Sequence, residues 1–466
     1  MTPRLAVRDI ALFERQVRFA KPFRFGAVTV DTAPQAYVRV EIEVEGRGTS
    51  IGASAEMMMP KWFDKRPELS PAATVDELRR SLAGARDLYL SGDGFDTAFG
   101  LHASRVGVQL ARCAKESIPP LAAAFGPAEI DKAVLDALLR ALGVDFFTAM
   151  AGNAAGIDAR LTPDLVPSGI DGFLASRAPG ASVAIRHTVG LDDELHGAGG
   201  VAAIAAGRCT RFFKLKLGGR PQADAERLAA IGREIDTVGG DIQVTLDANE
   251  QYADLAALAD LMGHLDSDKA LAPIARRLLY LEQPMPRDIT AQTPLGALAR
   301  RNVIIDEADD SYGAFAAAKV LGYRGVSSKS CKGLYKSILN AVRAARWSAE
   351  GPAYFVSGED LTCQAGLGVQ QDLALGALLG LTHAERNGHH YVAGFGDAPA
   401  AEAKAFMAAH PDLYVDRGEG VRLAAAAGAL STASLRKPGF AGGAHPDWAS
   451  LSPLHEPSHD KNLQEH

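Results

Sequence analysis

Short apolar segments alternate with amphipathic helical segments along the middle of the chain. The apolar segments occupy residues 182–188, 212–217, 242–248, 278–282, 302–306, 325–329 and 354–358, and a less distinct eighth occupies 381–385. Between them, segments such as 224–238 and 335–349 repeat apolar residues at helical spacing. Strands that alternate with helices about seven or eight times predict parallel βα units, and this length favours a closed α/β barrel over an open doubly wound sheet. No GxGxxG follows any of these strands, so nothing indicates a dinucleotide-binding fold.

The N-terminal region has a different pattern. Residues 36–44 alternate apolar and polar side chains, as a half-exposed antiparallel strand does, and helical segments follow around 74–83 and 103–115. Two aromatic and basic segments, 21–26 and 57–65, are expected to be loops. Either they pack within their own domain, or they reach over a neighbouring site and touch a ligand.

The predicted organisation is an α+β capping domain (1–127), a barrel (128–400) and a C-terminal segment (401–466) that packs on the capping domain and ends in a frayed tail. The tail is rich in Pro, Gly and polar residues. Its scattered histidines are not expected to bind metal; they are His445, His455, His459 and His466.

Composition narrows the class of protein without naming a function. The 466 residues carry 49 basic and 56 acidic side chains, a net charge of −7, which argues against nucleic acid as the main partner. Four cysteines without CxxC spacing form no disulfide framework. No signal peptide and no apolar run of membrane-spanning length is visible. We expect a cytoplasmic protein without membrane or nucleic-acid partners, and leave a homo-oligomer open.

Charged residues close several of the predicted strands. They are Lys214 and Lys216, Asp247, Glu282, Asp306 and Lys329, each group about one βα unit from the next. In a barrel the carboxyl ends of the strands converge at one mouth, where the chemistry takes place. These side chains are therefore expected to meet.

Three carboxylates on consecutive strands predict a site for a hard cation. Any one of them alone is more often a helix cap or a turn residue. Together they offer the oxygen ligands that Mg²⁺ prefers. Lys214 and Lys216 point to the same side of their strand, and their mutual repulsion is expected to lower the proton affinity of one ammonium, which makes a neutral amine base available. Lys329 approaches from the opposite wall, whereas Lys332 is expected to be a loop residue.

The ordered set KxK, DxN, ExP, DE and a late Lys resembles the enolase superfamily, and within it the mandelate racemase/muconate lactonizing enzyme family. The segment AVLDALLRALG is similar to the helix that leads that family into its barrel. The resemblance covers most of the chain. It implies an α+β capping domain on a modified (β/α)7β TIM-type barrel, Mg²⁺ as cofactor and carboxylate substrates.

The resemblance also implies roles for individual residues. Asp247, Glu282 and Asp306 become the metal ligands. Lys216 is the base on one face, Lys214 its electrostatic partner and a contact for the substrate carboxylate, and Lys329 the acid/base on the other face. Candidates for substrate contacts or for support of the ligands are Asn249, Glu307, Glu359, Phe23 and Trp62.

Three features bear on the subgroup and the pocket. No Asp–His dyad is evident at the sixth and seventh strand ends, and Lys329 stands there instead, which points to the lactonizing-enzyme-like subgroup. Residues 267–277 resemble an insertion in the third βα unit. Glu359 or Asp360 is a candidate for facing substrate, while His389 and His390 follow Asn-Gly and belong either to an ordinary turn or to the rim of the pocket.

The expected function is Mg²⁺-dependent removal of a proton next to the carboxylate of a small acid. The resulting enediolate leads to racemisation or epimerisation, cycloisomerisation, or dehydration, so the enzyme is an isomerase or a lyase. Two alternatives remain: an aldolase that forms a Schiff base through Lys216 or Lys329, and an idle protein on the same scaffold that binds Mg²⁺ and carboxylate without catalysis.

Overall fold

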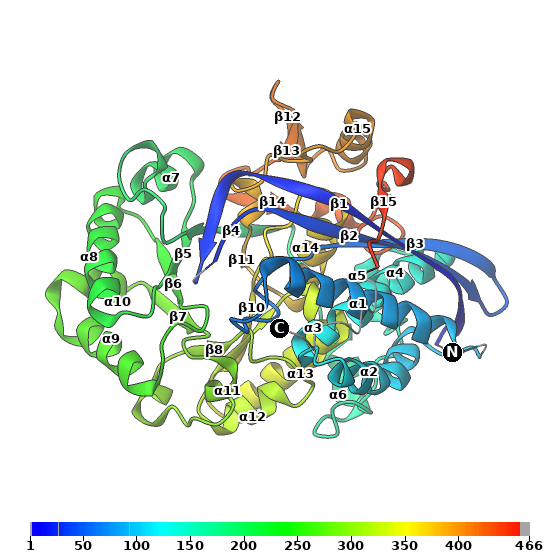
Figure 1. Ribbon diagram of the computed structural model, residues 1–466, viewed down its shortest axis with the longest axis horizontal. Coiled ribbons are helices and arrows are strands. Elements are labelled where there is room, and N and C mark those ends of the chain that lie inside the picture. Colours follow the sequence, from blue (N-terminus) through cyan, green and yellow to red (C-terminus); the bar gives the residue numbers. More distant parts are fainter. Residues whose placement is uncertain (1, 27, 93, 457–466) are drawn as a thin grey trace, which may run out of the picture.

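A computed structural model describes residues 2–26, 28–92 and 94–456 of the chain (Figure 1). Residues 457–466, which include His459, His466 and the end that was expected to fray, lie outside the described part.

Eight parallel strands form a closed barrel, as predicted, because β11 pairs with both β10 and β4. The less distinct segment 381–385 does contain the eighth strand. The strands are β4 (Ser182–Val189), β5 (Phe212–Lys216), β6 (Gln243–Asp247), β7 (Leu278–Glu282), β8 (Val303–Ile305), β9 (Gly325–Ser328), β10 (Phe355–Gly358) and β11 (His383–Glu385).

Helices follow the strands around the outside of the barrel (Figure 1). In α8 (Pro221–Val238), Pro221 occupies the first turn, where no backbone N–H is needed, and Leu228, Ile231 and Ile235 are buried along one face. The outer helices are α7 (Val201–Arg208), α8, α9 (Leu255–Ser267), α10 (Ala272–Ala275), α11 (Arg287–Thr290), α12 (Ala314–Val320), α13 (Leu334–Glu350) and α14 (Leu367–Leu379). The segment expected to be an insertion holds a 3-10 turn and α10, and Pro273 at the start of α10 lies next to Gly232 of α8.

The capping domain is an antiparallel sheet in the order β15-β1-β2-β3, with helices on one side. The strands are β1 (Leu5–Phe25), β2 (Val28–Val44), β3 (Gly48–Met57) and the short β15 (Ser452–Pro453); the helices are α1 (Pro71–Leu90), α2 (Ala98–Lys115), α3 (Pro120–Ala123) and α4 (Phe125–Leu142). The pairing of β15 with Phe13 and Glu14 of β1 brings the C-terminal segment onto the capping sheet.

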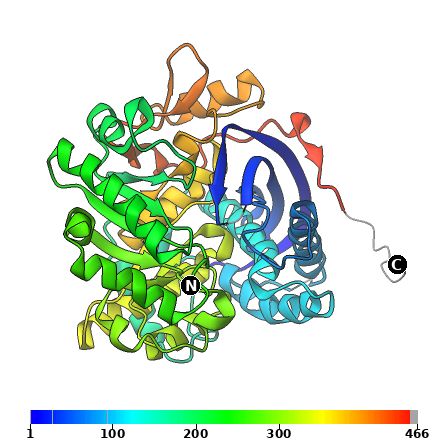
Figure 2. The same ribbon diagram turned by 60° about the vertical axis from the view of Figure 1, so that its left-hand side comes forward.

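The hairpin of β1 and β2 is longer than the sequence pattern indicated. Residues 21–26 were expected to be a loop, but Phe23 and Phe25 still pair with Val30 and Val28, so the strand continues to the tip. The expectation failed because the register shifts between Arg18 and Phe23, which hides the regular alternation. Figures 1 and 2 show this blue hairpin reaching from the cap across to the barrel strands.

Helix α4 joins the cap to the rest of the chain, and the predicted domain boundary at residue 127 falls within it. The Asp136 carboxylate accepts hydrogen bonds from the backbone N–H groups of Ala53 on β3 and of Phe440 near the C-terminus. The remaining elements are α5 (Phe146–Ala151), α6 (Pro167–Ala175), α15 (Ala400–Ala409), the pair β12 (Tyr414–Asp416) and β13 (Val421–Leu423), and β14 (Ala429–Ser431), which pairs antiparallel with β4.

Across the described ranges, none of the helices combines the length and the apolar character that crossing a bilayer requires. All four cysteines are free thiols, and Cys209 is the exposed one.

Close packing between β3 and α4 predicts that adding a side chain at Gly52 destabilises the fold. A Cβ atom there would overlap backbone atoms of Ala133 and Ala137, so Gly52→Ala should lower the free energy of unfolding by about 1–3 kcal/mol. The same substitution at Gly107, which is exposed on α2 with open space around it, should raise stability by up to about 1 kcal/mol. Urea unfolding measures both, and equal effects would contradict this packing.

Candidate active site

The charged residues at the strand ends meet at one mouth of the barrel. Lys216 pairs in register with Asp247, and Asp247 in turn with Glu282, so the ends of β5, β6 and β7 lie at one height. Asp306 follows directly after β8, and Lys329 directly after β9. All five side chains are buried.

Lys214 lies at the centre of the cluster. Its Nζ is 2.9 Å from Asp247 Oδ2, 2.8 Å from Glu282 Oε2, 2.7 Å from Glu359 Oε2 and 2.9 Å from Glu385 Oε2. Burial disfavours the ammonium, but the four carboxylates outweigh burial and raise the pKa of Lys214 well above its usual value. Lys214 is therefore not the one of the two lysines whose proton affinity falls, because carboxylates and not Lys216 dominate its surroundings.

Lys216 lies nearer the opening of the mouth. Its Nζ is 2.6 Å from Asp247 Oδ2 and 2.8 Å from Asn249 Oδ1, and it lies 5.9 Å from the centre of the Phe23 ring. Asn249 also donates its backbone N–H to Asp247 Oδ1 at 2.9 Å. Asp247 and Asn249 together therefore fix where the Lys216 amine lies.

Lys329 approaches from another part of the wall, as predicted for a residue beyond the acidic strands. Its Nζ is 2.5 Å from Asp306 Oδ2 and 4.2 Å from the centre of the Trp62 ring. Burial works against both charges, yet each stabilises the other, so the pKa of Lys329 is raised and that of Asp306 is lowered. Lys332, expected to be a loop residue, is fully buried in a 3-10 turn, where its Nζ lies 3.3 Å from Asp306 Oδ1.

Both aromatic and basic segments, 21–26 and 57–65, reach this mouth of the barrel. Phe23 and Phe25 of the hairpin tip, with Met59 and Trp62 beyond β3, line a pocket whose floor includes Lys214, Lys216 and Lys329. The free space in this pocket is only about 20 Å³, so a substrate must displace these covering side chains or water.

An ion-pair network holds residues 57–65, which we call the Trp62 segment, over the pocket. Lys65 Nζ lies 2.7 Å from Glu250 Oε2 and 2.8 Å from Glu307 Oε1, and it also donates to the Asn249 carbonyl. Arg287 pairs with Glu250 at 2.9 Å and donates to the carbonyl oxygens of Trp62 and Phe63. The candidate residues Asn249 and Glu307 therefore contact the cap as well as the barrel.

The predicted residue Glu359 lies below the pocket and not in its lining. It pairs with Arg186 and Lys214, and burial within the barrel leaves it no exposed surface. Asp360 lines the pocket in its place, and burial raises the pKa of Asp360 to about 6 despite the nearby Arg386.

Sequence reasoning missed Glu385 and Asn387, which both line the pocket. Glu385 closes β11, accepts a hydrogen bond from Thr188 at 2.6 Å and contacts Lys214. The signal was present, since Glu385 ends the eighth apolar segment as the other charged residues end theirs. His389 and His390 do not line this pocket.

The carboxylate set suits a divalent cation in its chemistry and charge. Asp247, Glu282 and Asp306 offer oxygen atoms only. Burial and the neighbouring Asp247 and Glu359 raise the pKa of Glu282 well above its usual value, and Lys214 only partly opposes this. The three carboxylates are not yet gathered closely enough to surround an ion. Within the described ranges, the group whose potential ligand atoms all lie within 4.8 Å of one another consists of three histidines, not of these carboxylates. The Lys214 ammonium instead lies between Asp247 and Glu282.

Comparisons with known proteins identify the fold. No family model and no curated protein matches the sequence. A dipeptide epimerase from Enterococcus faecalis, solved with Mg and L-Leu-L-Tyr, matches 94% of this chain and 99% of its own with a TM-score of 0.60 at 14% identity. An enolase superfamily member from Roseovarius nubinhibens, complexed with magnesium, covers 97% and 99% with a TM-score of 0.57 at 19% identity.

A muconate lactonizing enzyme from Mycobacterium smegmatis, complexed with muconolactone, matches 95% of this chain and 98% of its own with a TM-score of 0.59 at 18% identity. This chain therefore shares the fold of these solved structures, a TIM-type barrel with an N-terminal cap, which confirms the predicted fold class. Identities this low establish the fold alone.

The network around Glu250 predicts an acid-dependent loss of stability. Burial raises the carboxyl pKa, but Lys65 and Arg287 lower it from 4.5 to about 2. A lowered folded-state pKa contributes stability that is present above pH 4.5 and lost as the pH falls towards 2. Glu250→Gln should therefore cost about 3 kcal/mol of unfolding free energy near neutral pH, and the difference from wild type should vanish in acid.

Urea unfolding as a function of pH checks this prediction. Glu45→Gln is the matched control, because the Glu45 side chain is exposed and its pair with Arg4 spans 3.9 Å. A Glu250→Gln difference that is independent of pH would contradict the proposed ion pairing.

Proposed function

We propose that this protein is an Mg²⁺-dependent enzyme of the enolase superfamily that moves the proton next to the carboxylate of a small acid. One observation carries the proposal: two lysines, Lys216 and Lys329, reach one pocket from strands on different sides of a buried carboxylate cluster. Racemisation or epimerisation is the outcome that uses both lysines, because one can take a proton from one face and the other can return one to the opposite face.

In this proposal Asp247, Glu282 and Asp306 hold Mg²⁺. The neighbours solved with magnesium support this choice of ion. The ion supplies positive charge against which the substrate carboxylate can accept a second negative charge. Binding requires the Lys214 ammonium to leave its position between Asp247 and Glu282, and it is then free to face the substrate carboxylate.

Lys216 accepts the α-proton, and Asp247 and Asn249 hold its amine in position. Lys329 begins as an ammonium, since its pairing with Asp306 raises its pKa, and it can return a proton to the other face. For the opposite enantiomer the two lysines exchange roles. The electron pair left at the α-carbon delocalises into the carboxylate, so the proton balance closes without an oxidant or a reductant.

The aromatic side chains of the cap cover the two lysines in the pocket. Phe23, Phe25 and Trp62 exclude water from the lysines and offer apolar contacts to a substrate side chain. An acid with an apolar or amide-linked substituent fits this lining. The neighbour that binds L-Leu-L-Tyr makes dipeptides and N-acyl amino acids the first substrates to try.

The lysine assignment predicts face-specific defects. With Mg²⁺ and a panel of L,L- and D,L-dipeptides and N-acyl amino acids in D₂O, NMR should show exchange of the α-proton by the wild type. Lys216→Ala should lose exchange from one configuration and Lys329→Ala from the other, each by about 10²–10⁴-fold. Lys404→Ala, an exposed change on α15, should keep full activity. If both pocket variants keep wild-type exchange, the assignment is wrong.

The metal assignment predicts that chelation removes activity and that Mg²⁺ restores it. Asp306→Asn should fail to regain exchange at Mg²⁺ concentrations that restore the wild type, because it removes one charged oxygen ligand. Exchange that persists in EDTA would contradict the metal assignment. Binding of Mg²⁺ and of the acid without proton exchange would favour the idle protein. An adduct trapped by borohydride would favour the aldolase.

A further inference from the structure

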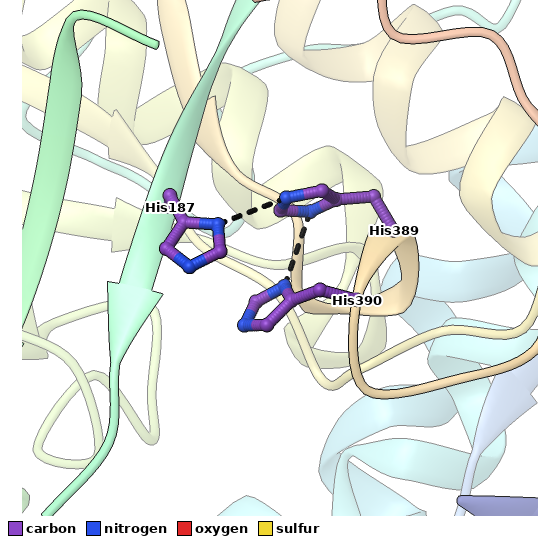
Figure 3. A group of neighbouring side chains, drawn as sticks. All are labelled: His187, His389 and His390. Carbon is purple, nitrogen blue, oxygen red and sulfur yellow. Dashed lines mark hydrogen bonds between the residues drawn. The ribbon is translucent and has the colours of Figure 1, made fainter. Parts of the chain in front are cut away.

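A group of three histidines lies on the outer side of the barrel wall. Arg186 and Thr188 on β4 contact Glu359 and Glu385 within the barrel, so His187 between them projects outwards. His389 and His390 come from the 3-10 turn after β11 and the residue that follows it. The three rings point towards one another (Figure 3); we call them the histidine cluster.

The spacing of the ring nitrogens suits a shared metal ion. One nitrogen from each ring lies within 4.8 Å of one from each of the others. His187 Nδ1 is 3.0 Å from His389 Nε2. Two nitrogens bound tetrahedrally to one Zn²⁺ at about 2.0–2.1 Å lie about 3.3 Å apart, so small shifts bring the rings into ligand positions.

The hydrogen bonds outside the cluster orient one ligand. His389 Nδ1 faces the carbonyl oxygen of Arg386, which only accepts, so Nδ1 carries the hydrogen and Nε2 presents its lone pair towards His187. Metal-binding histidines are commonly held in this way, by a hydrogen bond from the other ring nitrogen to a backbone carbonyl.

One polar atom of the cluster has nothing to bind within the described part of the chain. His390 Nε2 is buried and has no hydrogen-bond partner there. Leaving a buried nitrogen unpaired is costly, and a ligand bond to an ion would remove that cost. Burial also lowers the pKa of each of the three histidines, which favours the neutral imidazole that a metal requires.

We propose that the histidine cluster is a second metal site, which takes a transition metal of the Zn²⁺ type. Imidazole nitrogens suit Zn²⁺ and its neighbours in the transition series, whereas Mg²⁺ prefers oxygen. The site is therefore distinct in chemistry from the carboxylate cluster inside the barrel. A cavity of about 400 Å³ reaches His389 from the surface between Arg208, Cys209 and Arg422, and provides a way in and room for water as a further ligand.

The same segment connects the cluster to the cap. The His390 ring lies 4.0 Å from Tyr391, centre to centre, and Tyr391 lies 4.4 Å from Phe23, which covers the active-site pocket. The Tyr391 carbonyl accepts the backbone N–H of Ala20 on β1 at 2.8 Å. A metal at the cluster would therefore hold the segment that anchors the hairpin tip.

Cobalt titration tests the proposal on the full chain. Protein freed of transition metals is kept in excess Mg²⁺ and titrated with Co²⁺, a Zn²⁺ substitute that absorbs visible light. Zn²⁺ is then added to displace the bound Co²⁺. The wild type should bind one Co²⁺ with histidine-type absorption bands. His187→Ala and His390→Ala should each weaken binding at least about tenfold.

Two controls separate this site from scattered histidines. His196→Ala changes an exposed histidine, and a triple change of His455, His459 and His466 to Ala alters the tail; both should bind Co²⁺ like the wild type. Circular dichroism without metal shows whether each variant folds. A wild type that binds no Co²⁺ in excess Mg²⁺ overturns the proposal without relying on any variant, and so does binding that survives in both His187→Ala and His390→Ala.

Hydrogen exchange tests the connection to the cap. Zn²⁺ should slow amide exchange at Ala20 in the wild type and leave the rate unchanged in His390→Ala. Metal binding with unchanged Ala20 exchange would overturn the anchoring role. Because these readouts need neither substrate nor turnover, failure of the proposed enzymatic function would not affect them.

Discussion

The arrangement of the barrel mouth depends on the concentration of buried charge around Lys214. Four carboxylates contact the one Lys214 ammonium. Burying any of these charged groups without a partner would cost a large desolvation free energy. Their balance fixes the positions of the neighbouring groups: Glu359 connects the cluster to Arg186 below, and Asp247 connects it to Lys216 above. Burial and the neighbouring carboxylates still raise the pKa of Glu282 well above its usual value, and Lys214 only partly opposes this.

Ion pairs also hold the cap against the barrel. Lys65 and Arg287 bring the Trp62 segment to the barrel through Glu250 and Glu307. The hairpin tip is held on its other side through Tyr391. Aromatic side chains from both segments therefore cover the lysines.

The barrel and its strand-end residues could be predicted from the sequence, because period and spacing place a charged residue at the end of each of the five consecutive strands β5 to β9. Of the two candidates Glu359 and Asp360, it is Asp360 that lines the pocket, a choice that sequence leaves open because it does not show how far beyond β10 the chain turns. The extended hairpin tip escaped prediction because of its shifted register. The histidine cluster could not be predicted, since it joins His187 to residues some two hundred positions away across the closing pair β4 and β11.

Anomalous diffraction from crystals grown with Mn²⁺ in place of Mg²⁺ tests the central claim most directly. We expect one anomalous peak bound by Asp247, Glu282 and Asp306, with the Lys214 ammonium displaced from its place between the first two. Well-ordered crystals with no peak among these carboxylates, and with Lys214 still paired to both, would contradict the claim that this mouth is a divalent-metal centre.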